Sequence, residues 1–224
     1  MAQISAWLWD RLLPHAQSPT VHKRRAARSN DATPSAASSR SKVYEPRPGC
    51  LHELLTPVMT TLYERSRETV HLGVLLDGEV ALLGRLHGRR TAPHILRLGS
   101  RFLAHCSAMG KAMLAHDVDA TEALLARGLA PRAANTIVDA TEFRQELRRI
   151  RERGIAISDQ EARAQLSCVA IALLDETRRP VAALAISGPT RGFDVRRQAA
   201  LLRGVAAEAE RRIRYAAHAE RRAS

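Results

Sequence analysis

Apolar side chains recur at regular spacing from residue 51 onward. A spacing of three or four residues predicts a helix with one buried face, formed by Leu51, Leu54, Leu55, Val58, Met59 and Leu62. Pro57 lies inside this helix and is expected to bend it or to shift its start. Two apolar runs, Thr69–Leu76 and Glu79–Leu86, are joined by Asp77 and Gly78. An Asp-Gly pair between two such runs is the strongest short-range indication of a β-hairpin.

Further helices and strands are predicted downstream of this hairpin. The helices begin at Ser107, near Asp119, at Thr141 and near Asp194. The Thr141 hydroxyl is expected to cap its helix, which ends at Arg153 before Gly154, and Gly128 is expected to end the preceding helix. The strands are Ile155–Ile157, Ser167–Leu174 and Val181–Ser187, the last two joined by a turn at residues 175–180. Two hairpins and several helices without regular strand–helix alternation predict an α+β fold with an antiparallel sheet.

The segment ahead of these elements has a different composition. Residues 17–49 are rich in Ser, Ala, Arg and Pro and show no apolar period. Such a segment buries too little surface to offset its chain entropy. We therefore expect residues 1–48 to form a low-complexity, basic, disordered segment and residues 49–224 to form the folded domain.

The cellular compartment is predicted from three features. No apolar run has the length of a membrane span, and the first nine residues lack the basic start of a signal peptide. Cys50, Cys106 and Cys168 are odd in number and widely spaced, which predicts buried thiols in a reducing cytoplasm and no structural zinc.

The net charge of +12 is concentrated at the two ends of the chain. Residues 1–48 carry eight Lys and Arg against three Asp and Glu, and residues 191–224 carry nine Arg against four acids. Basic ends fit electrostatic attraction to DNA. However, Arg outnumbers Lys by 32 to 3 and Ala is abundant, as GC-rich coding also produces, so charge alone does not decide the function.

The sequence shows no strong catalytic or metal-binding pattern. His94 and His105 do not have the spacing of metal ligands, and Ser187 does not lie in a nucleophile elbow. Asp159 and Glu161 lie together, and we interpret them as a solvated turn. The sequence therefore predicts neither an enzyme nor a metal or cofactor site.

A ligand pocket is better supported. Small residues begin the segment 107–115, so the free N–H groups of this helix start are accessible to a carboxylate or phosphate. Ser187 ends a hydrophobic strand and Cys168 lies on the neighbouring strand, so both side chains are candidates to line the same cavity.

Four patterns in order resemble one known family. They are Ser107–Ala115, Asn135–Ile137, residues 154–170 with Asp159–Glu161 and Cys168–Ala170, and Ala185–Pro189. Together they resemble the effector-binding domain of the IclR family of bacterial transcriptional regulators, over about Leu51 to Tyr215. The resemblance implies a GAF-like antiparallel sheet flanked by helices.

The resemblance also implies a set of ligand-binding residues. These are Ala108, Met109, Leu166, Cys168, Ala185 and Ser187. Two positions depart from the family pattern, because Ser158 stands where an acidic residue is frequent and Ala185 where a hydroxyl residue is frequent. Two expectations follow: either the effector is a small organic or aromatic acid less polar than pyruvate or glyoxylate, or the pocket has lost its ligand.

The implied function is transcription regulation by a cytoplasmic homodimer or homotetramer that senses an effector. A winged helix-turn-helix takes about sixty to seventy residues with three apolar-periodic helices. The first fifty residues show neither that length nor that pattern, so DNA binding is expected only if an intact winged helix-turn-helix is supplied. The alternative is a free-standing effector-binding or oligomerisation module without DNA-binding activity of its own.

Overall fold

The computed structural model describes residues 48–89 and 100–223. One sheet contains the strands β1 (Thr69–Leu76), β2 (Glu79–Leu86), β3 (Arg101–Leu103), β4 (Ala156–Asp159), β5 (Leu166–Leu174) and β6 (Pro180–Pro189). The helices are α2 (Pro48–Ser66), α3 (Ala108–Leu114), α4 (Val118–Arg127), α5 (Ala140–Arg153) and α6 (Val195–Ala223). The strand order is β3-β2-β1-β6-β5-β4 and every pairing is antiparallel, which confirms the predicted α+β class.

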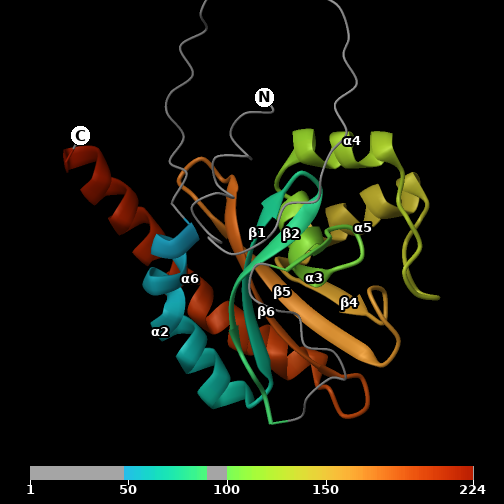
Figure 1. Ribbon diagram of the computed structural model, residues 1–224, viewed down its shortest axis with the longest axis horizontal. Coiled ribbons are helices and arrows are strands. Elements are labelled where there is room, and N and C mark those ends of the chain that lie inside the picture. The colour runs from blue at the N-terminus through green and yellow to red at the C-terminus, as the bar shows by residue number, and fades with distance from the viewer. Residues whose placement is uncertain (1–47, 90–99, 224) are drawn as a thin grey trace, which may run out of the picture. The chain divides into compact units, whose positions relative to one another are not determined.

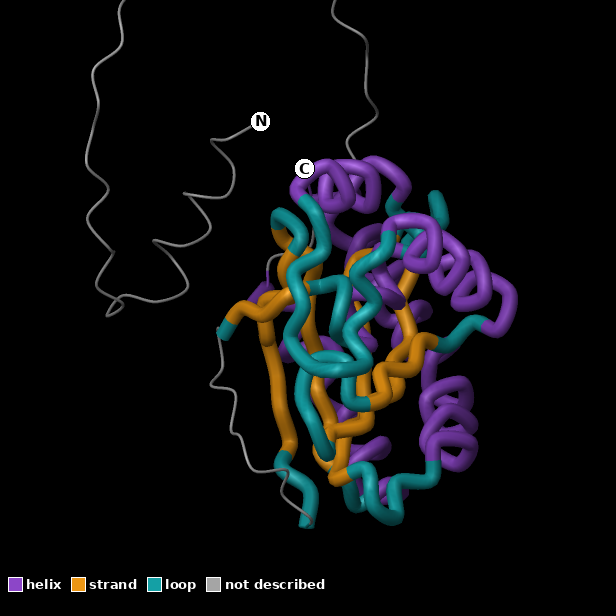
Figure 2. The backbone as a smooth tube through the Cα atoms, turned by 90° about the vertical axis from the view of Figure 1, so that its right-hand side faces the viewer, coloured by secondary structure: helices purple, strands orange, loops and turns teal. Residues whose placement is uncertain are grey.

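The two faces of the sheet carry different helices. Helices α2 and α6 cover one face, and α3, α4 and α5 lie on the other (Figure 1). Alternation along β6 follows this division, because Ala183 and Ala185 join the hydrophobic core around α3, whereas Leu184 and Ile186 are fully buried outside that cluster. In Figure 2, loops cross in front of the strands and helices lie above and to the right of them.

Turn and cap residues explain most element boundaries. Asp77 and Gly78 both have positive φ angles, 52° and 81°, as a type I′ hairpin turn requires. Gly154 ends α5 in the left-handed conformation. The predicted Thr141 cap is wrong: Asp139 is the N-cap of α5, and its carboxylate accepts a hydrogen bond from the Glu142 amide.

Helix α3 packs unusually close to the chain that precedes it. A Cβ atom added to Gly110 would lie 2.2 Å from the Ala104 carbonyl oxygen, a distance that no side chain tolerates. Glycine at this position therefore lets the helix that carries Ala108 and Met109 settle against residues 104–107.

Several other expectations have outcomes in the structure. The predicted disordered segment, residues 1–48, lies outside the described residues except for Pro48. The domain boundary at residue 49 therefore remains a prediction. Helix α2 runs through Pro57 and begins well before it.

The expectation of buried thiols holds for Cys106 only, since Cys50 is exposed and Cys168 is half-buried. Within residues 48–89 and 100–223, no helix combines the length and the apolar character needed to cross a membrane.

Candidate effector-binding site

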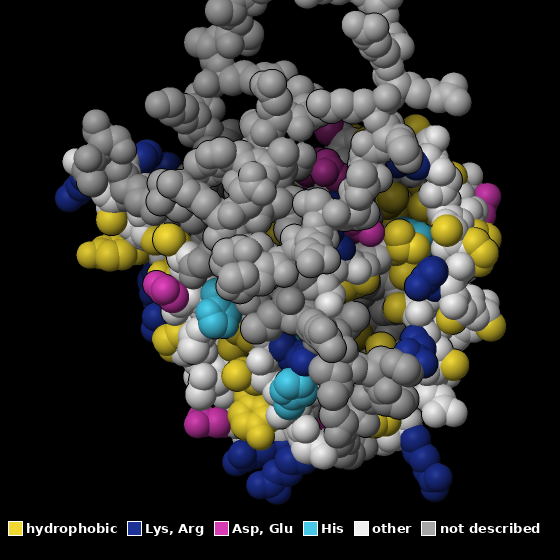
Figure 3. Space-filling model, in the orientation of Figure 1, with side chains coloured by type: hydrophobic (Ala, Val, Ile, Leu, Met, Phe, Trp, Pro, Cys, Tyr) yellow, Lys and Arg dark blue, Asp and Glu magenta, His cyan; other side chains and the backbone are white. Residues whose placement is uncertain are grey.

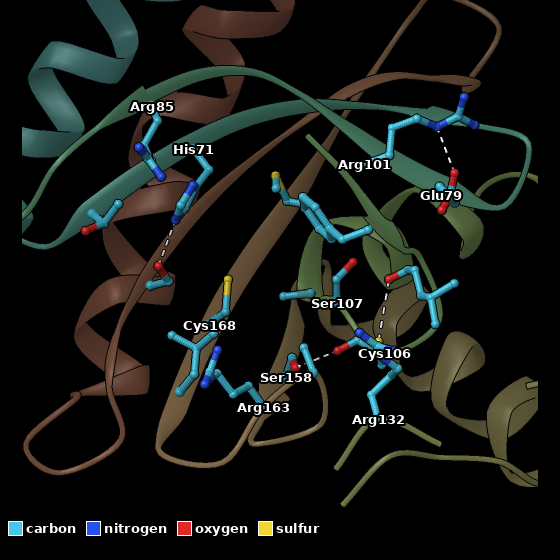
Figure 4. Close-up of a pocket in the computed structure, with 18 of the residues that line it drawn as sticks. His71, Glu79, Arg85, Arg101, Cys106, Ser107, Arg132, Ser158, Arg163 and Cys168 are labelled. Carbon is cyan, nitrogen blue, oxygen red and sulfur yellow. Dashed lines mark hydrogen bonds and ion pairs between the residues drawn. The ribbon is translucent and has the colours of Figure 1, made fainter. Parts of the chain in front are cut away.

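A cavity of about 530 Å³ lies on the face of the sheet that carries α3 (Figure 4). This volume falls within the range of small-molecule pockets. Its lining comes from all six strands, from the start of α3, and from the loops that follow α4 and precede β5. The lining side chains include Thr69, His71, Glu79, Arg85, His87, Arg101, Phe102, Leu103, Cys106, Ser107, Ala108, Met109, Arg132, Ser158, Ala162, Arg163, Leu166, Cys168 and Ser187.

Five of the six residues predicted for the ligand site line this one cavity. They are Ala108, Met109, Leu166, Cys168 and Ser187. Cys168 and Ser187 are direct partners in the β5–β6 ladder, which is why their side chains share a face. Ala185 is two residues before Ser187 on the same strand but is fully buried in the hydrophobic core and is not among the lining residues.

The cavity is more basic than the sequence pattern indicated. Arg85, Arg101, Arg132 and Arg163 line it, against a single carboxylate, that of Glu79. The Arg101 guanidinium lies 2.8 Å from the Glu79 carboxylate, whereas no carboxylate of the described residues pairs with the other three arginines. On the face shown in Figure 3, Lys and Arg side chains are interspersed among hydrophobic ones. The lining therefore favours an anion with an apolar body.

Sequence reasoning missed these arginines because each comes from a different segment. Arg85 is the last residue but one of β2, Arg101 begins β3, Arg132 follows α4 and Arg163 lies in the loop before β5. None stands in a motif, and only the fold brings them to one cavity. The short strand β3 was also missed, since three residues are too few to show an apolar period.

His71 and Ser187 form a buried hydrogen-bonded pair at one end of the cavity. The Nε2 atom of His71 lies 2.8 Å from the Ser187 hydroxyl oxygen. Burial, followed by the charges of Arg85 and His87, lowers the pKa of His71 to about 4. A histidine with this pKa is a weak base at neutral pH, and its Nδ1 atom has no orienting partner among the described residues. The pair therefore lacks the properties of a serine nucleophile and its base.

The cavity thiols are similarly unreactive. Burial raises the pKa of Cys106 to about 11 and that of Cys168 to about 12. Both therefore remain protonated at neutral pH, and a thiol is a much poorer nucleophile than a thiolate. The Ser158 hydroxyl donates to the backbone oxygen of Cys106 at 3.0 Å and so ties β4 to the segment before α3. Within the described part of the chain, no group of three or more His, Cys, Asp or Glu is placed to hold a metal ion.

The start of α3 is a floor of small side chains. The Ser107 hydroxyl caps the helix by accepting from the Gly110 amide at 3.0 Å and donates to the Ala104 carbonyl oxygen. Ala108 and Met109 follow in the first turn and line the cavity, so a ligand can approach the backbone closely there. Because α3 has only seven residues, its dipole is small and any attraction is local to these amides.

A buried ion pair holds the loop that carries Arg163 against α3. The Lys111 ammonium is 2.5 Å from the Glu161 carboxylate, and Lys111 is 1% exposed. The Glu161 backbone oxygen accepts from the Thr136 hydroxyl at 2.6 Å, and that hydroxyl accepts from the amide of Arg132 at 3.0 Å. The two loops that carry Arg132 and Arg163 are thus tied to each other and to the cavity floor.

This pair corrects one expectation from the sequence. Asp159 is exposed, but Glu161 is buried and is not part of a solvated turn. Burial raises the pKa of Glu161, and the nearby Lys111 ammonium lowers it in part. Nothing in the sequence indicated that Glu161 is buried, because its partner Lys111 lies fifty residues away along the chain.

The domain is thus an α+β fold in which a six-stranded antiparallel sheet has helices on both faces and a partly open, ligand-sized cavity beside α3. The family model described as bacterial transcriptional regulator IclR C-terminal matches residues 50–213, and the chain belongs to this family.

Similar proteins include the transcriptional repressor IclR of Escherichia coli strain K12, which is 32% identical over 149 residues, covering 61% of this chain and 51% of that protein. The HTH-type transcriptional repressor AllR of the same strain is 30% identical over 136 residues, covering 60% and 50%. The chain therefore spans about half the length of the curated relatives it matches.

Solved structures agree with this assignment. The IclR of Thermotoga maritima superposes with a TM-score of 0.68 at 28% identity, covering 72% of this chain and 67% of that chain. An IclR homologue from Microbacterium hydrocarbonoxydans, complexed with 4-hydroxybenzoate, has a TM-score of 0.68 at 26% identity, with the same coverage.

Proposed function

We propose that this chain senses a small organic or aromatic acid as the effector-binding part of an IclR-type transcriptional regulator. The observation that carries the proposal is the cavity, in which apolar walls are combined with four arginines and one carboxylate. Its contacts are assigned to Ala108, Met109, Leu166, Cys168 and Ser187. Support comes from the relative that is complexed with 4-hydroxybenzoate, an aromatic acid.

The proposed mechanism is a population shift. An acid that fills the cavity contacts α3, β5, β6 and the tied loops at once, so it stabilises one arrangement of these elements over others. In the whole regulator this preference is coupled to the pairing of subunits and to the spacing of DNA-reading domains. We assign the protein to the cytoplasm. Its proposed activity is regulation and not catalysis, and this activity requires no cofactor.

Thermal shift with a panel of small acids tests the site. A ligand raises the melting temperature by mass action on the folded state. Ala108→Trp fills the space in front of α3 and should abolish the shift, and Ala162→Trp, at a half-buried loop position of the lining, should reduce it. Ala126→Trp, at an exposed position on α4, is the matched control and should keep it. An acid that still stabilises both cavity variants fully would place the site elsewhere.

The second candidate is a free-standing effector or oligomerisation module. It is favoured by residues 1–50, which show no winged helix-turn-helix pattern. A gel shift with the 224-residue chain separates the two: weak, salt-sensitive, sequence-independent binding through basic ends supports the module. Strong recognition of one operator near physiological salt would instead support a regulator that binds DNA by itself.

A further inference from the structure

One end of the cavity holds polar hydrogens for which the described residues supply no acceptor. His71 and Arg85 are direct partners in the β1–β2 ladder, and both side chains line the cavity. The Nδ1 atom of His71 and the Nε atom of Arg85 are buried, and neither has a hydrogen-bond partner among the described residues. Buried polar atoms are normally paired, so this corner needs an explanation.

The hydrogen bond between His71 and Ser187 does not remove the deficit. If the Ser187 hydroxyl donates to Nε2, the proton of the neutral ring is on Nδ1 and has no acceptor. If Nε2 donates instead, the Ser187 hydroxyl proton has no acceptor among the described residues. In either tautomer one donor remains, in addition to Arg85 Nε.

The charge at this end is also uncompensated. Burial lowers the pKa of Arg85, and no described carboxylate acts in the opposite direction. Arg101, by contrast, already has the Glu79 carboxylate at 2.8 Å. Donors without acceptors beside an unpaired guanidinium are the arrangement that a bound carboxylate completes, since guanidinium–carboxylate pairs are strong and directional.

This corner is well separated from the other polar end of the cavity. Glu79 and Arg85 are six residues apart on β2, which corresponds to about 20 Å at the strand rise of roughly 3.3 Å per residue. Figure 4 shows Arg85 and His71 at the opposite end of the site from Arg132, with Ser107 between them. Met109, Leu166 and other apolar residues line the space as well.

We propose that Arg85, His71 and Ser187 form a second carboxylate subsite, so that the effector is a dicarboxylic acid with a ring or another apolar spacer between its two acidic groups. This inference rests on the proposed function, because it assumes that the cavity binds an acid. It narrows the ligand class from an acid in general to one that is acidic at both ends.

Isothermal titration calorimetry with matched acids tests the inference. The probes are benzoate with its 1,3- and 1,4-dicarboxylates, and the longer biphenyl-4-carboxylate with its 4,4′-dicarboxylate. Within at least one series, we expect a dicarboxylate to bind the wild-type chain about tenfold or more tightly than the monoacid, as one charge-assisted pair predicts. Arg85→Met should remove this advantage, whereas Arg148→Met, at an exposed position on α5 outside the cavity, should retain it.

The melting temperature of the ligand-free protein provides a second readout. Arg85→Met removes an unpaired charge and keeps an apolar stem, so it should leave the melting temperature unchanged or raise it. A marked fall would show that Arg85 has a structural role and would overturn the proposal. Equal affinity for monoacids and dicarboxylates, unaffected by Arg85→Met, would overturn the subsite but leave the proposed function standing. If no acid in a broad panel binds the wild type, the proposed function fails, and the inference fails with it.

Discussion

His71 is a residue whose neutral form belongs to the fold. Its pKa falls from the ordinary 6.5 to about 4, mainly because the ring is buried. Between these values the unfolded chain binds a proton that the folded chain does not, so stability falls as the pH drops through this window. Above the unfolded pKa both states are neutral and the effect vanishes. The full loss corresponds to about 3 kcal/mol once the pH is below the folded value.

Urea unfolding at about pH 7 and about pH 4 checks this sign. The wild type should lose more unfolding free energy over this interval than His71→Gln, in which no proton is taken up at position 71. Burial also lowers the pKa of His105 and His116, so both lower the stability at acidic pH. Because both residues are present in the wild type and in the variant, the difference between the two losses of unfolding free energy is due to His71. An equal loss in both proteins would show that His71 is not buried in its neutral form.

Lys111 offers a second prediction at the scale of residues. Lys111→Met leaves the buried Glu161 carboxylate without its close partner and should lower the unfolding free energy by about 3–5 kcal/mol. Lys111→Met with Glu161→Leu removes both charges and should recover most of that loss. Chemical denaturation of the single and double variants measures the difference. If the double variant is no more stable than the single one, the pair does not stabilise the loop in the way described.

Individual residues were predictable where a motif positioned them and not where the fold did. Cys168 and Ser187 were assigned to one cavity from adjacent strands, and their ladder pairing explains why they lie together. Ala185 lies in the core and not along the cavity, because a two-residue alternation gives the face of the sheet but not the edge of a cavity. Arg85 and His71 were missed because their proximity depends on the register of β1 against β2, which no local pattern specifies.

Secondary-structure elements were predicted best where turn chemistry was strong. The hairpin at Asp77 and Gly78 and the end of α5 at Gly154 follow from backbone conformations that few residues adopt. The start of α5 was misread by two residues, because Asp139 and Thr141 are both good caps and only the backbone geometry distinguishes them. Strand β3 has no local signature and exists through its pairing with β2.

The close approach of α3 gives a prediction at the scale of elements. Gly110→Ala places a methyl group against the Ala104 backbone, so α3 must move, and we expect a loss of roughly 1–3 kcal/mol together with weaker ligand binding. Gly204→Ala on α6 is the matched control, because an added Cβ there meets nothing within 4 Å. It should be neutral or stabilising by up to about 1 kcal/mol. Thermal melts of the two variants measure both changes in stability. Equal changes for Gly110→Ala and Gly204→Ala would contradict the close contact between α3 and Ala104.

For the whole molecule, the division of the sheet faces separates two tasks. The cavity occupies the face that carries α3, while α2 and α6 cover the opposite face. A variant on the outer surface of α6 should therefore leave the cavity intact, and a variant in the cavity should leave the surface of α6 intact. This separation allows assembly and ligand binding to be tested independently.

Assembly is the last prediction. We expect the chain to form a dimer or tetramer through α6, because this long helix exposes 77% of Tyr215 among Ala-rich positions. Light scattering at micromolar concentration should give a multiple of the 24.7 kDa chain mass. Tyr215→Lys should shift the distribution toward the monomer, whereas Val118→Lys, at a comparably exposed position on α4, should not. A monomer mass for the wild type would reject assembly, and dissociation by the Val118 variant alone would move the interface to α4. Because neither position lines the cavity, the acid-dependent rise in melting temperature should persist in both variants.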